Sequence, residues 1–152
     1  MKPTLLSLLI GICMILSAAR LDAQQNAVMI QVLDGYTGVA IARHAVSISL
    51  GTTAADAAAQ KNVQNTFTDE RGILMLPLSS GPTGWLQLWT ADMHSCDPHA
   101  ATNSFSLAKI SGTGVQAPNS CSTMAVKPSA CHLIIFLREF TPAERAAMLP
   151  HK

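Results

Sequence analysis

The amino-acid sequence predicts an all-β protein, a Greek-key antiparallel β-sandwich of about seven strands with a short C-terminal helix. Apolar residues recur mostly at every second position, which is the period of a strand that buries one face. Clusters of Gly, Pro, Asn and Ser divide the chain into short pieces, as in strands joined by turns. No long helical segments lie between these pieces to serve as parallel crossovers, so we expect antiparallel pairing.

The first two expected strands each present one apolar face. Their inward residues are Val28, Ile30 and Val32, followed by Val46, Ile48 and Leu50. Ser47 and Ser49 are expected on the outward face of the second strand, because side chains alternate between the faces of a sheet. The Asp34-Gly35 pair after the first strand indicates a turn.

The alanine-rich stretch 52–64 has helix propensity but no large side chain to pack, so we expect either a mobile loop or a single helical turn there. A β-hairpin is expected next. Its two strands, over 66–68 and 74–78, are joined by a tight turn over 69–72 that contains Gly72.

The second half of the chain is expected to hold three further strands and one helix. The strands are expected over 85–90, 104–110 and 133–137, with loops over 91–103 and 111–130. The last strand is apolar on both faces, which is typical of a central strand. The helix is expected to begin with Thr141 as its N-cap, Pro142 at its first position and Glu144 closing a capping box, and to end at Pro150.

Residues 1–23 are typical of an export signal, which leaves one β-sandwich domain over 24–152. Lys2 precedes an apolar stretch, and the small residue Ala23 stands at the expected cleavage site. The apolar stretch is shorter than the roughly 20 residues that span a bilayer. We therefore expect a secreted or periplasmic protein, which would contact the membrane only if its leader were not cleaved.

The expected mature chain keeps three cysteines, which allow one disulfide and one free thiol in an oxidising compartment. We favour Cys96 with Cys121, because both lie in turn-rich segments, whereas Cys131 directly precedes a strand. The other pairings remain open. A disulfide that closes a loop of about 25 residues stabilises a fold by roughly 3 to 4 kcal/mol.

Several short patterns in the first half of the chain occur together. They are Val32-Leu33-Asp34 followed by Thr37, Gly38 and Ile41, then Val46 and Ile48, then Thr68 to Gly72, and the apolar alternation before Gly84. On these residues the stretch 28–90 resembles the carboxypeptidase regulatory-like domain, a transthyretin-like Greek-key sandwich. The chain departs from the family pattern at Ala40, where Pro is usual, and at His44, where Gly is usual.

The resemblance implies an exported β-sandwich and no known chemistry, since residues 91–140 are similar to the second half of small uncharacterised exported bacterial proteins. Transthyretin-like hydrolases end in Tyr-Arg-Gly-Ser, and this chain ends in Leu-Pro-His-Lys. The resemblance therefore does not extend to the hydrolases.

Composition excludes one class of partner. Charged residues form only 12% of the chain, and ten basic side chains nearly cancel nine acidic ones. Nucleic-acid binding depends on a basic surface, so no nucleic-acid partner is expected.

One loop carries the densest group of candidate metal ligands. His94, Cys96 and His99 are side chains that zinc and copper favour. A periplasmic metal-binding protein is therefore the alternative function. A metal ion and the disulfide cannot both use the sulfur of Cys96, so the two interpretations exclude each other at this residue. Apart from such a metal ion, no cofactor is expected.

The remaining motifs point to binding rather than catalysis. Ser106 and Lys109 form a Ser-x-x-Lys pattern, but the expected strand would direct their side chains to opposite faces. We therefore expect no catalytic residues and no enzyme. Trp85 and Trp89 share one strand face and offer a ligand platform if exposed, although we expect at least one to be buried.

His44 and His132 flank strands and are expected at the surface. The function predicted from the sequence is a non-catalytic, exported binding or scaffolding module of the bacterial cell envelope. Its expected partner is an unknown envelope protein or glycan.

Overall fold

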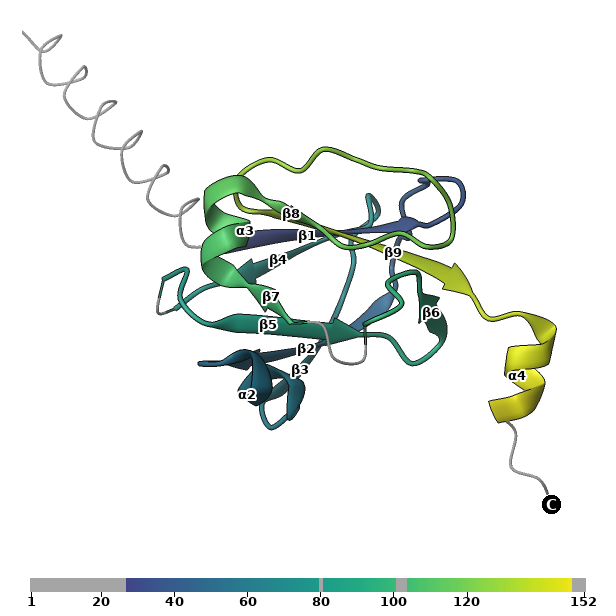
Figure 1. Ribbon diagram of the computed structural model, residues 1–152, viewed down its shortest axis with the longest axis horizontal. Coiled ribbons are helices and arrows are strands. Elements are labelled where there is room, and N and C mark those ends of the chain that lie inside the picture. The colour runs from purple at the N-terminus through teal and green to yellow at the C-terminus, as the bar shows by residue number, and fades with distance from the viewer. Residues whose placement is uncertain (1–26, 80, 101–103, 149–152) are drawn as a thin grey trace, which may run out of the picture.

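The structure, a computed structural model, describes residues 27–79, 81–100 and 104–148. Within these residues, nine strands form one sheet of five strands and one of four, and a short helix follows the last strand (Figure 1). The expected β-rich fold with a C-terminal helix is thus confirmed. None of the helices in the described part of the chain is long and apolar enough to cross a membrane. The expected export signal lies outside the described residues.

The five-stranded sheet has the order β4-β1-β9-β6, and β8 also pairs with β9. Its strands are β1 (Ala27–Asp34), β4 (Ile73–Pro77), β6 (Met93–Ser95), β8 (Val115–Gln116) and β9 (His132–Glu139). β4 and β6 run antiparallel to their neighbours, whereas β1 and β8 run parallel to β9. The expectation of purely antiparallel pairing is therefore wrong for this sheet. An irregular segment over 117–131 connects β8 to β9, and most of the chain separates β1 from β9, so no crossover helix is needed.

The four-stranded sheet has the order β3-β2-β5-β7 and is antiparallel throughout. Its strands are β2 (Ala45–Gly51), β3 (Val63–Phe67), β5 (Trp85–Trp89) and β7 (Phe105–Ser106). β3 forms one edge of this sheet. β7 covers only the first two residues of β5 at the other edge, because their register ends at Leu86.

The expected hairpin between β3 and β4 does not form. β3 pairs with β2 in one sheet and β4 pairs with β1 in the other, so residues 68–72 make a corner between the sheets. The Asp69 carboxylate accepts hydrogen bonds from the backbone N–H groups of Arg71 and Ile73, and the carbonyl of Gly72 accepts one from Val32. The predicted turn over 69–72 therefore forms, but it connects strands of two different sheets.

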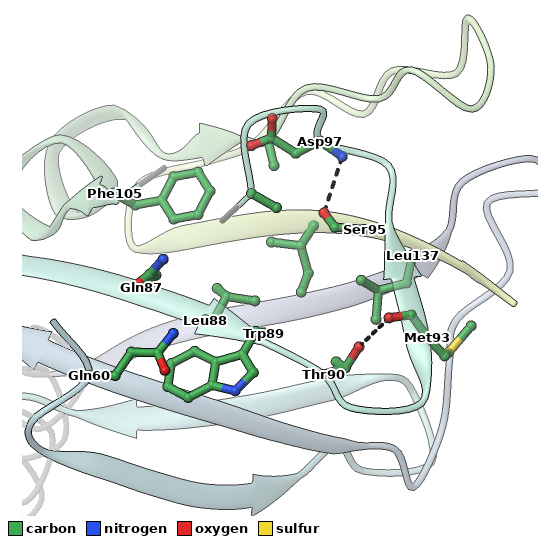
Figure 2. A pocket seen from close by; sticks show the side chains of 13 residues that line it. Gln60, Gln87, Leu88, Trp89, Thr90, Met93, Ser95, Asp97, Phe105 and Leu137 are labelled. Carbon is green, nitrogen blue, oxygen red and sulfur yellow. Dashed lines mark hydrogen bonds between the residues drawn. The ribbon is translucent and has the colours of Figure 1, made fainter. Parts of the chain in front are cut away.

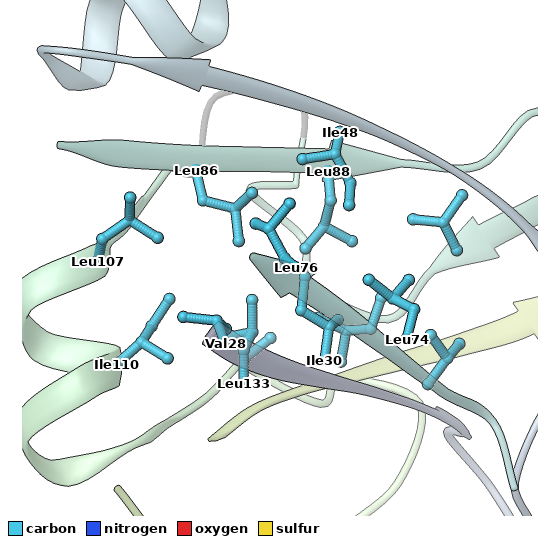
Figure 3. Packing of buried hydrophobic residues seen from close by; sticks show 14 of the residues in the cluster. Val28, Ile30, Ile48, Leu74, Leu76, Leu86, Leu88, Leu107, Ile110 and Leu133 are labelled. Carbon is cyan, nitrogen blue, oxygen red and sulfur yellow. The ribbon is translucent and has the colours of Figure 1, made fainter. Parts of the chain in front are cut away.

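The main hydrophobic core fills the space between the two sheets (Figure 3). The inward residues predicted for β1 and β2 contribute to it, and Val28, Ile30 and Ile48 are at most 1% exposed. Leu86 and Leu133 meet them from β5 and β9. Each such side chain contributes about 1.5–3 kcal/mol of hydrophobic stabilisation.

A second, smaller core covers the outer face of β9 and explains why this strand is apolar on both faces. It contains Leu33, Cys96, Ile134 and Phe136, and residues of the segment over 117–131 pack against it. The Cys96–Cys121 disulfide holds this segment in place, which confirms the predicted pairing. Cys131 has a free thiol.

Over the residues that the structure describes, three helices lie outside the sheets: α2 (Ala54–Ala58), α3 (Leu107–Thr113) and α4 (Pro142–Met148). α2 is the helical turn that the alanine-rich stretch allowed, and Thr53 and Asp56 form its capping box. α3 replaces most of the strand expected over 104–110, because Ser106 ends β7 and caps the helix. α4 has the predicted capping box between Thr141 and Glu144.

Candidate functional site

The candidate site is a cavity at the edge of the molecule where the outermost strands of both sheets are short. β7 covers β5 only up to Leu86, and β6 and β8 each cover a different part of β9. The cavity lies at this open edge, beside Trp89 and between β5, β6 and β9 (Figure 2). Short edge strands therefore create the opening, and the strands around it supply rigid walls.

Apolar side chains form most of the inner surface of this cavity. They are Leu88, Met93, Ala100, Phe105, Ala117, Ile135 and Leu137. Its volume is about 120 Å³. A dry apolar cavity of roughly 150 Å³ takes up benzene, so a space of this size holds one small ring or one branched apolar group. Drug-sized ligands need roughly 300 Å³ or more.

Polar groups at the cavity are held by local hydrogen bonds. The Thr90 hydroxyl donates to the carbonyl of Met93 over 2.9 Å. The Ser95 hydroxyl accepts from the backbone N–H of Asp97 over 3.1 Å. Gln60 and Gln87 also line the cavity. These bonds fix the conformation of residues 90–97, so this wall is structured before any ligand binds.

The two tryptophans lie on the outer face of the four-stranded sheet, as alternation predicts. Both are half-buried, so neither reaches the full burial expected for at least one of them. Helix α2 packs against β2 and β5 on this face, above the buried side chains of Ser49 and Gln87. Trp89 borders the cavity and Trp85 does not. Of the expected platform, only Trp89 therefore belongs to the candidate site.

The disulfide loop forms the other side of the site. Cys96 is 1% exposed, and its N–H donates to the carbonyl of Phe136 on β9. A Cβ atom at Gly35 would lie 2.3 Å from the sulfur of Cys96, so only glycine allows this approach. Ser95 and Asp97 flank the disulfide and line the cavity. The disulfide therefore ties this cavity wall to the segment over 117–131, and the backbone hydrogen bond of Cys96 ties it to β9.

The expected metal-ligand set does not form. Cys96 is in the disulfide and has no thiolate to offer a metal ion. His94 is exposed, and its ring packs edge-on against Phe140 at 5.8 Å. Within the described ranges, no group of three or more His, Cys, Asp or Glu side chains is arranged to hold a metal ion.

Ser106 has a structural role that the expected strand did not show. Its hydroxyl accepts a hydrogen bond from the backbone N–H of Lys109, as an N-cap does. The Ser-x-x-Lys pattern therefore marks the start of helix α3. The strand-based argument against this pair is wrong, but the hydroxyl is engaged in the cap.

Two histidines are more buried than their surface placement predicted. His44 is 9% exposed, and its Nε2 atom lies 3.2 Å from Asp92 Oδ1. His132 is half-buried, and its Nε2 atom has no hydrogen-bond partner among the described residues. Burial lowers the pKa of His132 because it penalises the charged imidazolium. Neither histidine lines the cavity.

A wider depression of about 710 Å³ lies near the start of helix α2 and the loop that precedes β5. Thr52, Asp56 and Lys61 are exposed along it. The Asp56 carboxylate accepts hydrogen bonds from the hydroxyls of Thr52 and Thr53, so it serves the helix cap. This depression is therefore more open and more polar than the cavity beside Trp89, and we do not treat it as the candidate site.

Comparisons with known proteins assign no family to this chain. No family model, no curated protein and no solved structure matches it.

Sequence reasoning found part of this site. It grouped Trp89 with Trp85 as a platform if exposed, and it placed Cys96 in a disulfide. It missed Ala117 and Gln60, which come from an irregular segment and from the end of helix α2. No local pattern shows that β7 stops at Ser106, so the cavity itself had no sequence signal.

Proposed function

We propose that this protein is an exported, non-catalytic binding module of the bacterial cell envelope, and that it captures one apolar side chain of an envelope protein in the cavity beside Trp89. The observation that carries the proposal is the preformed apolar cavity at an open sheet edge. Binding sites of this kind combine an apolar lining with a few placed polar groups.

The lining favours a protein partner over a glycan. Leu88, Phe105 and Leu137 present apolar surface, whereas a sugar ring carries hydroxyls that need polar partners. An apolar side chain that enters the cavity would gain roughly 25 cal/mol per Å² of buried surface. Trp89 adds a rigid aromatic wall, and such residues dominate the energetics of protein interfaces.

Binding without catalysis is supported by the side chains that surround the cavity. Its described lining contains no histidine, lysine or free cysteine, and the carboxylate of Asp97 accepts a hydrogen bond from the backbone N–H of His99. The lining hydroxyls of Ser95 and Thr90 take part in local hydrogen bonds. These side chains serve to hold a ligand.

Export is supported by two observations of different kinds. Residues 1–23 have the pattern of an export signal, and Cys96 and Cys121 form a disulfide, which persists in oxidising compartments. We further propose that the fold is a transthyretin-like Greek-key sandwich of the carboxypeptidase regulatory-like type. The two sheets that share one core support this kinship.

The cavity is tested with benzene as the apolar probe. Titration of the protein with benzene, followed by NMR, is expected to give saturable shifts at the Trp89 indole N–H and the Leu137 methyls. Ala117→Leu fills the cavity and is expected to abolish these shifts. Ala55→Leu, on an exposed position of α2, is the matched control and keeps them. Shifts that do not saturate, or that persist in Ala117→Leu, would contradict the proposal.

A further inference from the structure

Strand β3 is an open edge of the four-stranded sheet with an unusual surface. Its residues pair with β2 on one side, and no described strand covers the other side (Figure 1). Val63 is 42% exposed and Phe67 is 67% exposed. The strand Val63–Phe67 contains no charged residue, proline or glycine. Natural edge strands usually carry such residues to prevent pairing with another chain.

The hydrogen-bond ladder shows which residues of β3 offer their backbone at this edge. The Thr68 N–H donates to the carbonyl of His44, the residue opposite it, and the His44 N–H donates to the Thr68 hydroxyl. Thr68 therefore directs its backbone N–H toward the β2 side. Hydrogen-bonded pairs alternate along an antiparallel ladder. Val63, Asn65 and Phe67 therefore direct their N–H and C=O groups away from β2. These three residues form a row of unpaired backbone groups.

We propose that a second copy of this chain pairs with β3, strand against antiparallel strand, around a two-fold axis at Asn65. In this register Asn65 lies opposite Asn65 of the second copy, and Val63 lies opposite Phe67. All three outward-directed residues then exchange backbone hydrogen bonds with the second copy. A shift of the register by two residues leaves one of the three without a partner within the strand.

The side chains complement each other in the same register. Val63 and Phe67 project from the outer face of the sheet, so each copy sets a β-branched side chain opposite an aromatic one. Such cross-strand pairs contribute about 0.2–1 kcal/mol each. The exposed Lys61 of one copy is brought toward the exposed Asp69 of the other. One symmetric contact therefore pairs the backbone groups and the apolar side chains. It also brings Lys61 toward a carboxylate that already contacts Arg71 within its own copy.

The contact is short, so the dimer is expected to be reversible. Stable complexes bury roughly 1,200–2,000 Å² in total, and a single edge of five residues supplies less. We expect a dissociation constant in the micromolar range. The dimer leaves the cavity beside Trp89 free, because that cavity lies at the opposite edge of the sheet.

The oligomeric state of the full chain, recovered after export, is measured by sedimentation equilibrium across the micromolar range. The wild type is expected to approach twice the monomer mass. Asn65→Lys sets two lysines opposite each other on the axis and is expected to raise the dissociation constant at least about tenfold. Met75→Lys, on the exposed face of β4, is the matched control and leaves it unchanged. A monomer at all concentrations, which would leave this edge to a strand of another protein, overturns the proposal, as does an unchanged dimer in Asn65→Lys.

Cysteine cross-linking tests the register in a Cys131→Ser background. Hydrogen-bonded partners in a ladder lie about 5.5 Å apart at Cα, which a disulfide can span. Asn65→Cys is therefore expected to form a covalent dimer under oxidising conditions. Val63→Cys is a control at another exposed position of β3, and its two copies lie about 13 Å apart along the strand. Cross-linking through position 63 but not 65 would overturn the proposed register.

Discussion

The alternation of side chains along a strand determines which residues face the core, but it does not determine which residues are exposed to solvent. Leu86 and Leu88 face the core, and Trp85, Gln87 and Trp89 face the other way, as the period of the strand predicts. Gln87 is nevertheless only 2% exposed, because helix α2 packs over it. Burial of a single residue therefore depends on elements that lie elsewhere in the sequence.

His132 carries the clearest pH prediction at this scale. Its pKa is lowered by burial from the ordinary value of 6.5, so the unfolded chain binds a proton at higher pH than the folded one. Stability from the neutral ring is complete above about pH 6.5 and is lost as the pH falls through the folded pKa. Urea unfolding at about pH 7 and about pH 5 measures this loss.

His132→Phe keeps an aromatic ring and removes the proton. Its free energy of unfolding is expected to fall less between these pH values than that of the wild type. His94→Phe, at an exposed position, is the control and is expected to follow the wild type. Equal pH dependence in the wild type and His132→Phe would show that His132 does not carry this effect.

Secondary-structure elements with a strong local signal were predicted well, and their partners were not. β1, β2 and β5 follow from alternation, β9 follows from its continuous apolar run, and α4 follows from its capping box. The prediction of a hairpin between β3 and β4 was wrong, because the same turn after Thr68 can connect two paired strands of one sheet or two strands of different sheets. The parallel pairing of β1 with β9 joins strands about a hundred residues apart, a separation that local patterns cannot report.

Helix α4 is held against β9 by an ion pair between Arg138 and Glu144, which makes the stability of this helix depend on pH. Arg138 donates hydrogen bonds of 2.8 and 2.7 Å to the Glu144 carboxylate, and no residue of α4 is buried. These bonds hold the pKa of Glu144 far below its ordinary value of 4.5. The contribution of Glu144 is present above about pH 4.5 and is lost as the pH falls toward the folded pKa. Hydrogen exchange of residues 142–148 is expected to show protection at about pH 7 that decreases at about pH 3.

Glu144→Gln tests the same contact at neutral pH. It removes the charge and is expected to lower the protection factors of α4 severalfold at about pH 7. Arg145→Gln is the matched control, because Arg145 lies 4.0 Å from Glu139 on the exposed surface. Equal protection in Glu144→Gln and the wild type would contradict a role for the Arg138 pair in holding the helix.

In the whole molecule, the two edges of the four-stranded sheet differ in character. The β3 edge is regular and has a self-complementary surface, whereas the β5 edge is interrupted and opens into the cavity. The Cys96–Cys121 disulfide supports the second edge by holding the segment over 117–131 against β9. In the chain-entropy model a bridge between residues 25 positions apart contributes about 3 to 4 kcal/mol. We thus propose assembly at the β3 edge and binding at the β5 edge.

Photo-cross-linking in intact cells tests the binding function most directly. A photoreactive benzoylphenylalanine in place of Gln60, an exposed residue of the cavity, is expected to form one discrete adduct with an envelope protein. Adding Ala117→Leu to the same chain fills the cavity and is expected to remove that adduct, and the photoreactive residue at Met75 is expected to give no such adduct. An adduct that persists with Ala117→Leu, or the absence of any discrete adduct at Gln60, would contradict capture of a partner side chain in this cavity.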